Sequence, residues 1–134
     1  MSIFASPGFL RKVLLADAAS CLATGAAQVA ATQPLALLLG LPGPLLAGTG
    51  WFLLGYAAVV AVVATRDPVP TPLVWVFVAG NVGWAAACVA LLASGLLAPT
   101  ALGIAWVLAQ AVTVATLADL QWGGLRRHGR ARPA

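Results

Sequence analysis

Four long stretches of the chain are almost entirely apolar. They lie at residues 13–39, 45–65, 73–92 and 101–120. A helix rises about 1.5 Å per residue, so each stretch is long enough to cross about 30 Å of hydrocarbon. The pattern therefore predicts an all-α polytopic membrane protein, a bundle of four transmembrane helices that forms a single domain over residues 1–134.

Prolines agree with this division of the chain. Pro7, Pro44, Pro72 and Pro99 each stand near the start of an apolar stretch, where the missing backbone N–H costs nothing. Pro34 differs because it lies inside the first stretch. We expect it to kink or unwind the outer end of the 13–39 helix.

Polar residues interrupt the first stretch on one side only. At 100° per residue, Asp17, Ser20, Cys21, Thr24 and Gln28 fall within about 60° of one line along the helix. Because lipid cannot hydrogen-bond these groups, this face should point into the bundle or toward water.

Small residues form a second pattern on two of the helices. They are Ala23, Ala26, Ala27 and Ala30 in the first stretch and Gly50, Ala57, Ala61 and Thr65 in the second. Small side chains let helix backbones approach closely in a membrane. The 45–65 helix contributes almost no polarity, so we expect its small-residue row to contact a partner.

Matching polar rows occur in the last two stretches. They consist of Phe77, Asn81, Trp84 and Cys88 on one helix and Gly103, Trp106, Gln110, Thr113 and Leu117 on the other. We expect the first, third and fourth helices to line a shared interior. The candidate intramembrane polar site comprises Asp17, Ser20, Thr24, Gln28, Asn81, Gln110 and Thr113.

Two interpretations of this row remain open. In the first, amides and hydroxyls join helices and fix their register, at about 0.6 kcal/mol each and at most about 1.7. In the second, they coordinate a solute, an ion or a proton path.

Composition and charge support the membrane assignment. The chain is 62% hydrophobic and 7% charged, which leaves too little polar surface to coat a soluble globule. Arginine and lysine outnumber acidic residues 7 to 3. We expect these residues to contact anionic lipid headgroups rather than nucleic acid; they are Arg11, Lys12, Arg66, Arg126, Arg127, Arg130 and Arg132.

The basic residues also predict the orientation. They lie near the N-terminus, at the second loop and in a tail at 123–134, which we expect to begin where Gly123 and Gly124 end the last helix. By the positive-inside rule both termini face the cytoplasm. Trp51, Trp75 and Trp122 fall near the predicted interfaces, as membrane anchors do.

Asp17 and Asp119 lie about one turn from the cytoplasmic interface, near arginines. We interpret both first as salt-bridged interfacial anchors. The alternative is a carboxylate that titrates in a proton-coupled cycle, and Asp17 is the better candidate because it continues the polar face.

Little in the chain indicates catalysis or cofactor binding. Cys21 and Cys88 lie far apart, and His128 is the single histidine, so we expect no metal site and no cofactor. No nucleophile, phosphate-binding or hydrolase motif is present, and we expect no enzymatic activity. Residues 18–21 faintly resemble a lipoprotein cleavage site, but Asp17 interrupts the apolar region that a signal peptide needs.

Three segments carry a resemblance to a known group of proteins. "LRKVLLADAAS" with the following "ATG", the turn "LGLPGPLL", and "APTALGIAWVLAQAVTVATLADLQWGGLRR" resemble small four-helix inner-membrane proteins of proteobacteria that have no assigned activity. The "LGLP" segment is also loosely similar to DoxX-type four-helix proteins, although the glutamate expected in the following helix is missing. The resemblance implies a multi-pass protein of the bacterial inner membrane.

The sequence thus favours a non-enzymatic protein that oligomerises or serves as an accessory subunit of a membrane assembly. In that case the small-residue row with Gly50 and Ala57 contacts the partner. The alternative is a small oligomeric channel or a proton- or ion-coupled transporter that uses the candidate polar site.

Overall fold

A computed structural model of the chain describes residues 8–131, and the side chains of residues 8–127. These residues form helices without any strand. The helices are α1 (Phe9–Ala30), α2 (Thr32–Leu39), α3 (Gly43–Ala64), α4 (Thr71–Ser94) and α5 (Ala101–Ala131).

Four of these helices have the length and composition of membrane spans. The apolar windows of α1, α3, α4 and α5 have mean hydropathies of 1.4, 1.9, 2.0 and 1.8. α2 has eight residues, too few to cross a bilayer. The expected four-helix all-α bundle is confirmed, and the chain has the architecture of a multi-pass membrane protein.

The first apolar stretch is broken, as expected from Pro34, but the break lies three residues before that proline. α1 ends at Ala30 and α2 begins at Thr32. Proline lacks the N–H that would bond to the carbonyl four residues earlier, which here belongs to Ala30, and its ring crowds that carbonyl. The hydroxyl of Thr32 donates to the carbonyls of Gln28 and Val29. The expected interruption at the outer end of the 13–39 stretch is present, and the membrane span itself ends at Ala30 rather than at residue 39.

The last helix is longer than expected. α5 continues to Ala131 instead of ending at Gly123 and Gly124. A Cβ on Gly124 would lie 3.1 Å from a methyl carbon of Leu10, and Leu125 is buried in a cluster with Leu10 and Leu14. We expected the helix to end at Gly123 and Gly124. Packing against α1 instead keeps this segment helical.

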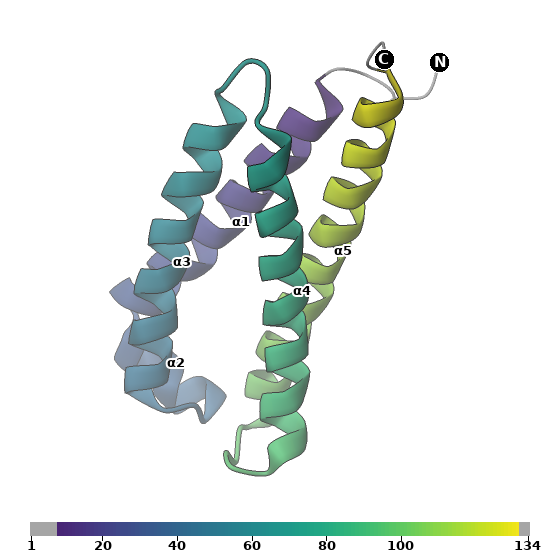
Figure 1. Ribbon diagram of the computed structural model, residues 1–134. Helices are drawn as coiled ribbons and strands as arrows, with labels where there is room; N and C mark the ends of the chain where they lie inside the picture. The colour runs from purple at the N-terminus through teal and green to yellow at the C-terminus, as the bar shows by residue number, and fades with distance from the viewer. Residues whose placement is uncertain (1–7, 132–134) are drawn as a thin grey trace.

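The bundle has two distinct ends (Figure 1). α1 begins, α5 ends and α3 connects to α4 at one end, while α2 and the α4–α5 connection lie at the other. At the second end, the backbone N–H of Thr100 donates to the carbonyl of Leu39 at 3.0 Å, and its hydroxyl donates to that of Leu38 at 2.8 Å. α2 is thereby fastened to the start of α5.

α1 and α3 pack closely, backbone against backbone, at two glycines. A Cβ on Gly25 would lie 2.8 Å from the carbonyl oxygen of Gly50, and a Cβ on Gly50 would lie 3.0 Å from the Cβ of Gln28. Ala57 is also buried. The expectation that Gly50 and Ala57 face a partner protein was therefore wrong, because they pack against α1 of the same chain.

The alanine row of α1 does not mediate this approach either. Ala23, Ala26 and Ala30 are exposed, and Ala27 is only half-buried. The sequence identified close packing by small residues correctly, but assigned it to the wrong face of α1. Glycine at position 25 brings the two backbones together.

Aromatic side chains join α3 to α4. Phe52 stacks on Trp84 with ring centroids 5.7 Å apart, and Tyr56 meets Phe77 edge to face at 5.6 Å. The Tyr56 hydroxyl donates to the carbonyl of Phe77 at 3.5 Å. These aromatic side chains fill the space between α3 and α4, whose backbones lie further apart than those of α1 and α3.

Candidate intramembrane polar site

Three helices meet at a buried carboxylate. The Oδ2 atom of Asp17 in α1 accepts a hydrogen bond from the amide of Asn81 in α4 at 3.0 Å and one from the amide of Gln121 in α5 at 2.7 Å. The Oδ1 atom accepts from the thiol of Cys21 at 3.5 Å. We call Asp17, Cys21, Asn81 and Gln121 the carboxylate cluster.

The carboxylate cluster is closed to the surroundings. Asp17 and Gln121 have no exposed surface, and Asn81 is 3% exposed. The Asn81 amide also donates to the Oε1 atom of Gln121 at 3.2 Å, so the three side chains form a ring of hydrogen bonds. The Oδ1 atom of Asn81 accepts none of the hydrogen bonds found among the described residues.

This geometry corrects our first interpretation of Asp17. An interfacial anchor would extend toward water and pair with a basic side chain. Asp17 instead points into the bundle, and its partners among the described residues are neutral. The polar face of α1 is turned inward, as its spacing predicted.

Gln121 was missed by the sequence analysis. The predicted apolar span ended at residue 120, one position before Gln121. A signal was present, because Gln121 follows Gln110 by eleven residues, about three helical turns, and so lies on the same face of α5.

A second polar cluster lies toward the other end of the bundle. The amide nitrogen of Gln28 donates to the carbonyl of Leu46 at 2.9 Å and to the hydroxyl of Thr49 at 2.8 Å. Its Oε1 atom accepts from the indole of Trp106 and from the amide of Gln110, both at 3.4 Å. The Trp84 indole donates to the Oε1 atom of Gln110 at 3.3 Å.

We call this set the glutamine cluster; it comprises Gln28, Thr49, Trp84, Trp106 and Gln110. It brings together Gln28 and Gln110, both candidates from the sequence. Thr49 shows that α3 contributes to the polar interior, contrary to our expectation for that stretch. A single threonine in an apolar helix does not indicate that its hydroxyl contacts a glutamine on another helix, so the sequence could not predict this contact.

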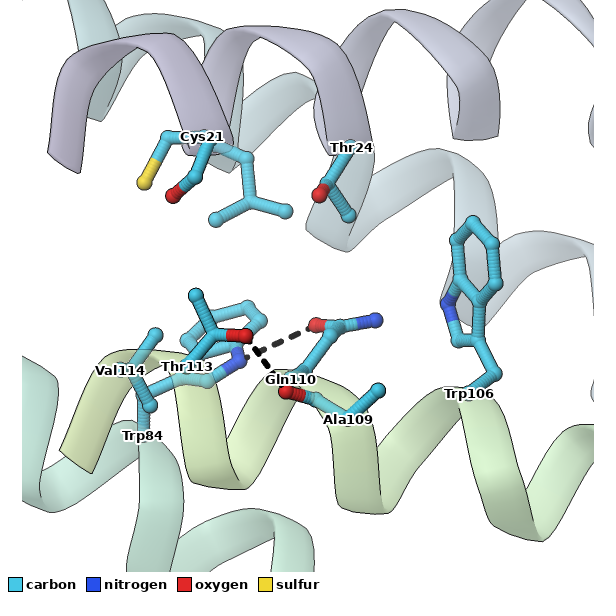
Figure 2. A pocket seen from close by; sticks show the side chains of 10 residues that line it. Cys21, Thr24, Trp84, Trp106, Ala109, Gln110, Thr113 and Val114 are labelled. Carbon is cyan, nitrogen blue, oxygen red and sulfur yellow. Dashed lines mark hydrogen bonds between the residues drawn. The ribbon is translucent and has the colours of Figure 1, made fainter. Parts of the chain in front are cut away.

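A cavity of about 160 Å³ separates α1 from α5 (Figure 2). Cys21 and Thr24 of α1 face Gln110 and Thr113 of α5 across it, and Trp106 stands at one end. The Thr24 hydroxyl makes no hydrogen bond to another described residue, so it is available to a molecule in the cavity. A cavity of this size has room for several water molecules.

The cavity connects the two clusters. Cys21 belongs to the carboxylate cluster and lines the cavity, as do Trp84, Trp106 and Gln110 of the glutamine cluster. A smaller pocket of about 70 Å³ lies beyond these three side chains and is lined by Gln28 and Thr49. Polar groups therefore follow one another through the interior from Asp17 to Thr49.

The remaining candidates of the polar site are less enclosed. Ser20 is half-buried, and its hydroxyl donates to the carbonyl of Asp17 at 3.1 Å. Thr113 is exposed at the rim of the cavity, and its hydroxyl donates to the carbonyl of Ala109.

The candidate anchors lie on the surface, but Asp119 makes none of the salt bridges that we expected with another described residue. Asp119, Trp51, Trp75 and Trp122 are exposed. Asp119 thus differs from Asp17, although the two had the same interpretation from sequence.

The basic residues occupy one end of the bundle, but Arg11 has an additional role. Its guanidinium donates to the carbonyls of Ala64 at 2.8 Å and Arg66 at 3.1 Å, which satisfies the end of α3. Lys12, Arg66, Arg126 and Arg127 are exposed. The side chain of Arg130 and all of Arg132 lie outside the described residues.

Among the described residues, no group of three or more His, Cys, Asp or Glu side chains lies close enough to hold a metal ion. The two clusters and the cavity present one carboxylate, a thiol, amides, hydroxyls and indoles. These groups bind protons, water and small polar solutes.

Comparison with known proteins adds no further constraint. No protein-family model, no curated protein and no solved structure matches the chain.

Proposed function

We propose that the protein is a small proton channel in which Asp17 takes up and releases the proton. One observation carries this proposal. A carboxylate that is fully buried among membrane-spanning helices is held by neutral amides from two other helices. Ionisable groups inside a membrane are expensive and are found where ions or protons move.

A purely structural role does not account for the carboxylate. An asparagine at position 17 could hydrogen-bond to α4 and α5 without bringing a charge into a medium of low dielectric constant. What a carboxylate adds is the exchange of a proton. The accessory-subunit role was expected to use Gly50 and Ala57 as the contact surface for a partner. Both residues are buried within the chain and do not offer that surface.

The partners of Asp17 suit both protonation states. Asn and Gln side chains carry a donor and an acceptor on the same amide. In the present arrangement Asn81 and Gln121 donate to the carboxylate. After protonation, rotation of one amide presents its oxygen to the new O–H group, so the site needs no cation in either state.

The cavity and the glutamine cluster supply a route for the proton. From Asp17 to Gln28 the polar face of α1 extends over eleven residues, about 16 Å at the helical rise. Water in the cavity between α1 and α5 would join Cys21 and Thr24 to Gln110. Gln110 and Gln28 then lead to the smaller pocket beside Thr49.

The proposal includes a setting for this route. The protein lies in the inner membrane of a bacterium, with the end that carries Arg66, Arg126 and Arg127 in the cytoplasm by the positive-inside rule. It acts without covalent chemistry. A homo-oligomer would enlarge the interior that 134 residues enclose.

Proton flux into liposomes tests the proposal. Purified protein is reconstituted with a pH-sensitive dye inside, and an outward potassium gradient, together with a potassium ionophore, drives protons inward. We expect the wild-type protein to acidify the lumen faster than protein-free liposomes do. Asp17→Asn should reduce the rate to that of protein-free liposomes, because asparagine does not exchange a proton.

Asp67→Asn is the matched control, since Asp67 is exposed in the α3–α4 connection, and it should retain the wild-type rate. Helical circular dichroism and a single elution peak show that each variant is folded. A wild-type rate equal to that of protein-free liposomes overturns the proposal in favour of an accessory role. So does a folded Asp17→Asn variant with wild-type flux.

A further inference from the structure

The outer face between α4 and α5 carries a long groove of about 440 Å³. Val78, Val82 and Ala85 line it from α4, and Ala115 and Ala118 line it from α5. α4 is the least enclosed span, with 11% of its apolar window buried. Small residues on both helices leave space that a lipid chain can fill.

The groove has the length of one membrane leaflet. Along α4 it extends from Trp75 to Ala85, ten residues or about 15 Å at the helical rise, which is half of the hydrocarbon thickness. Trp75 and Trp122 lie at the end nearer the termini, where aromatic belts meet the headgroups. One acyl chain of that leaflet therefore fits along it.

A charged pocket of about 310 Å³ continues the groove at this end. Asp119 and Trp122 line both spaces, and Arg126 and Arg127 line the charged pocket. The Arg126 guanidinium lies 4.8 Å from the centre of the Trp122 ring. Asp119 makes no hydrogen bond or ion pair to another described residue, so its carboxylate is available to a ligand.

We propose that the groove and the charged pocket together bind one phospholipid with an ethanolamine headgroup. Its acyl chain lies along the alanines, its phosphate meets Arg126 and Arg127, and its ammonium donates to Asp119. This site is independent of the buried carboxylate cluster.

The two signs of charge select this headgroup. A glycerol headgroup brings its negative charge toward Asp119 without a cation to match. A choline headgroup carries a cation that has no N–H to donate. Ethanolamine supplies both a phosphate for the arginines and hydrogen-bond donors for the carboxylate.

Native mass spectrometry tests the site. Protein in detergent is mixed with equal amounts of phosphatidylethanolamine, phosphatidylglycerol and phosphatidylcholine, and the lipids retained on the ion are counted. We expect the ethanolamine lipid to be retained most. Asp119→Asn should reduce its preference over the glycerol lipid by about fivefold, the effect of one charge at the headgroup level.

Two further variants separate the groove from the headgroup. Ala115→Leu fills the exposed groove and should reduce retention of all three lipids, whereas Ala105→Leu, at an exposed position of α5 outside the groove, should not. Asp67→Asn should keep the preference. Preferential retention of the glycerol lipid, or equal retention of all three, would overturn the proposal.

Discussion

Asp17 illustrates how one residue's surroundings set its role. A carboxylate in hydrocarbon is tolerated when each oxygen accepts hydrogen bonds from groups that are held in place. The amides of Asn81 and Gln121, on helices distant in sequence, donate to the Oδ2 atom, and the thiol of Cys21 donates to the Oδ1 atom. Asp119, two residues before Gln121, faces outward, because a shift of two positions turns a side chain by about 200° around the helix.

Replacement of Gln121 tests the strength of the carboxylate cluster. Gln121→Leu keeps the volume but removes the donor 2.7 Å from Asp17 and the acceptor of the Asn81 amide. We expect the free energy of unfolding, measured by titration with a denaturing detergent, to fall by about 1–2 kcal/mol.

Thr116→Val serves as the control for that measurement, because the Thr116 hydroxyl is exposed and donates only to the carbonyl of Val112. It should leave the unfolding free energy nearly unchanged. Equal stability of Gln121→Leu and the wild-type protein would show that the buried ring of hydrogen bonds contributes nothing to the fold.

At the level of the helix, the α1–α3 pair depends on the absence of a side chain. Gly25 and Gly50 face each other so closely that a Cβ on Gly25 would lie 2.8 Å from a backbone oxygen. Backbone cannot move aside as a flexible side chain can. The contact also positions Gln28 beside Thr49, so the packing of the pair and the glutamine cluster depend on each other.

Two glycine substitutions separate packing from helix propensity. Gly25→Ala should reduce the unfolding free energy by about 1–3 kcal/mol, because the methyl group forces α1 and α3 apart. Gly48→Ala, on α3 and with nothing within 4 Å of the added carbon, should raise it by up to about 1 kcal/mol. The same detergent titration measures both, and a neutral Gly25→Ala variant would contradict the close contact.

The helix boundaries show which local signals were sufficient. Pro34 predicted the interruption of the first stretch, and α1 ends at Ala30 because proline acts on the carbonyl four residues before it. Gly123 and Gly124 predicted an end that does not exist. The burial of Leu125 against Leu10 and Leu14 outweighs the cost of two glycines in a helix.

For the whole molecule, an even number of spans brings the start of α1, the end of α5 and the α3–α4 connection to one end of the bundle. Arg66, Arg126 and Arg127 are exposed there. The opposite connections carry no charged residue. This asymmetry predicts which end faces the cytoplasm.

Labelling of single cysteines measures the orientation. In a Cys88→Ala background, in which the remaining Cys21 is buried, a membrane-impermeant maleimide added to intact spheroplasts should modify Leu96→Cys. It should modify Asp67→Cys only after the membrane is permeabilised. The reverse labelling pattern would show that the α3–α4 connection lies outside the cytoplasm, and would contradict the orientation predicted by the positive-inside rule.

The sequence by itself determined the number of spans, the common end at which the first span begins and the last one ends, and the inward direction of the polar face on α1. These properties follow from hydropathy, length and helical period, which are local. Tertiary structure alone decided that Asp17 meets Asn81 and Gln121, that Gly25 meets Gly50, and that a cavity separates α1 from α5. Those contacts depend on the rotation and tilt of each helix against its neighbours, which many weak packing interactions between distant segments set together.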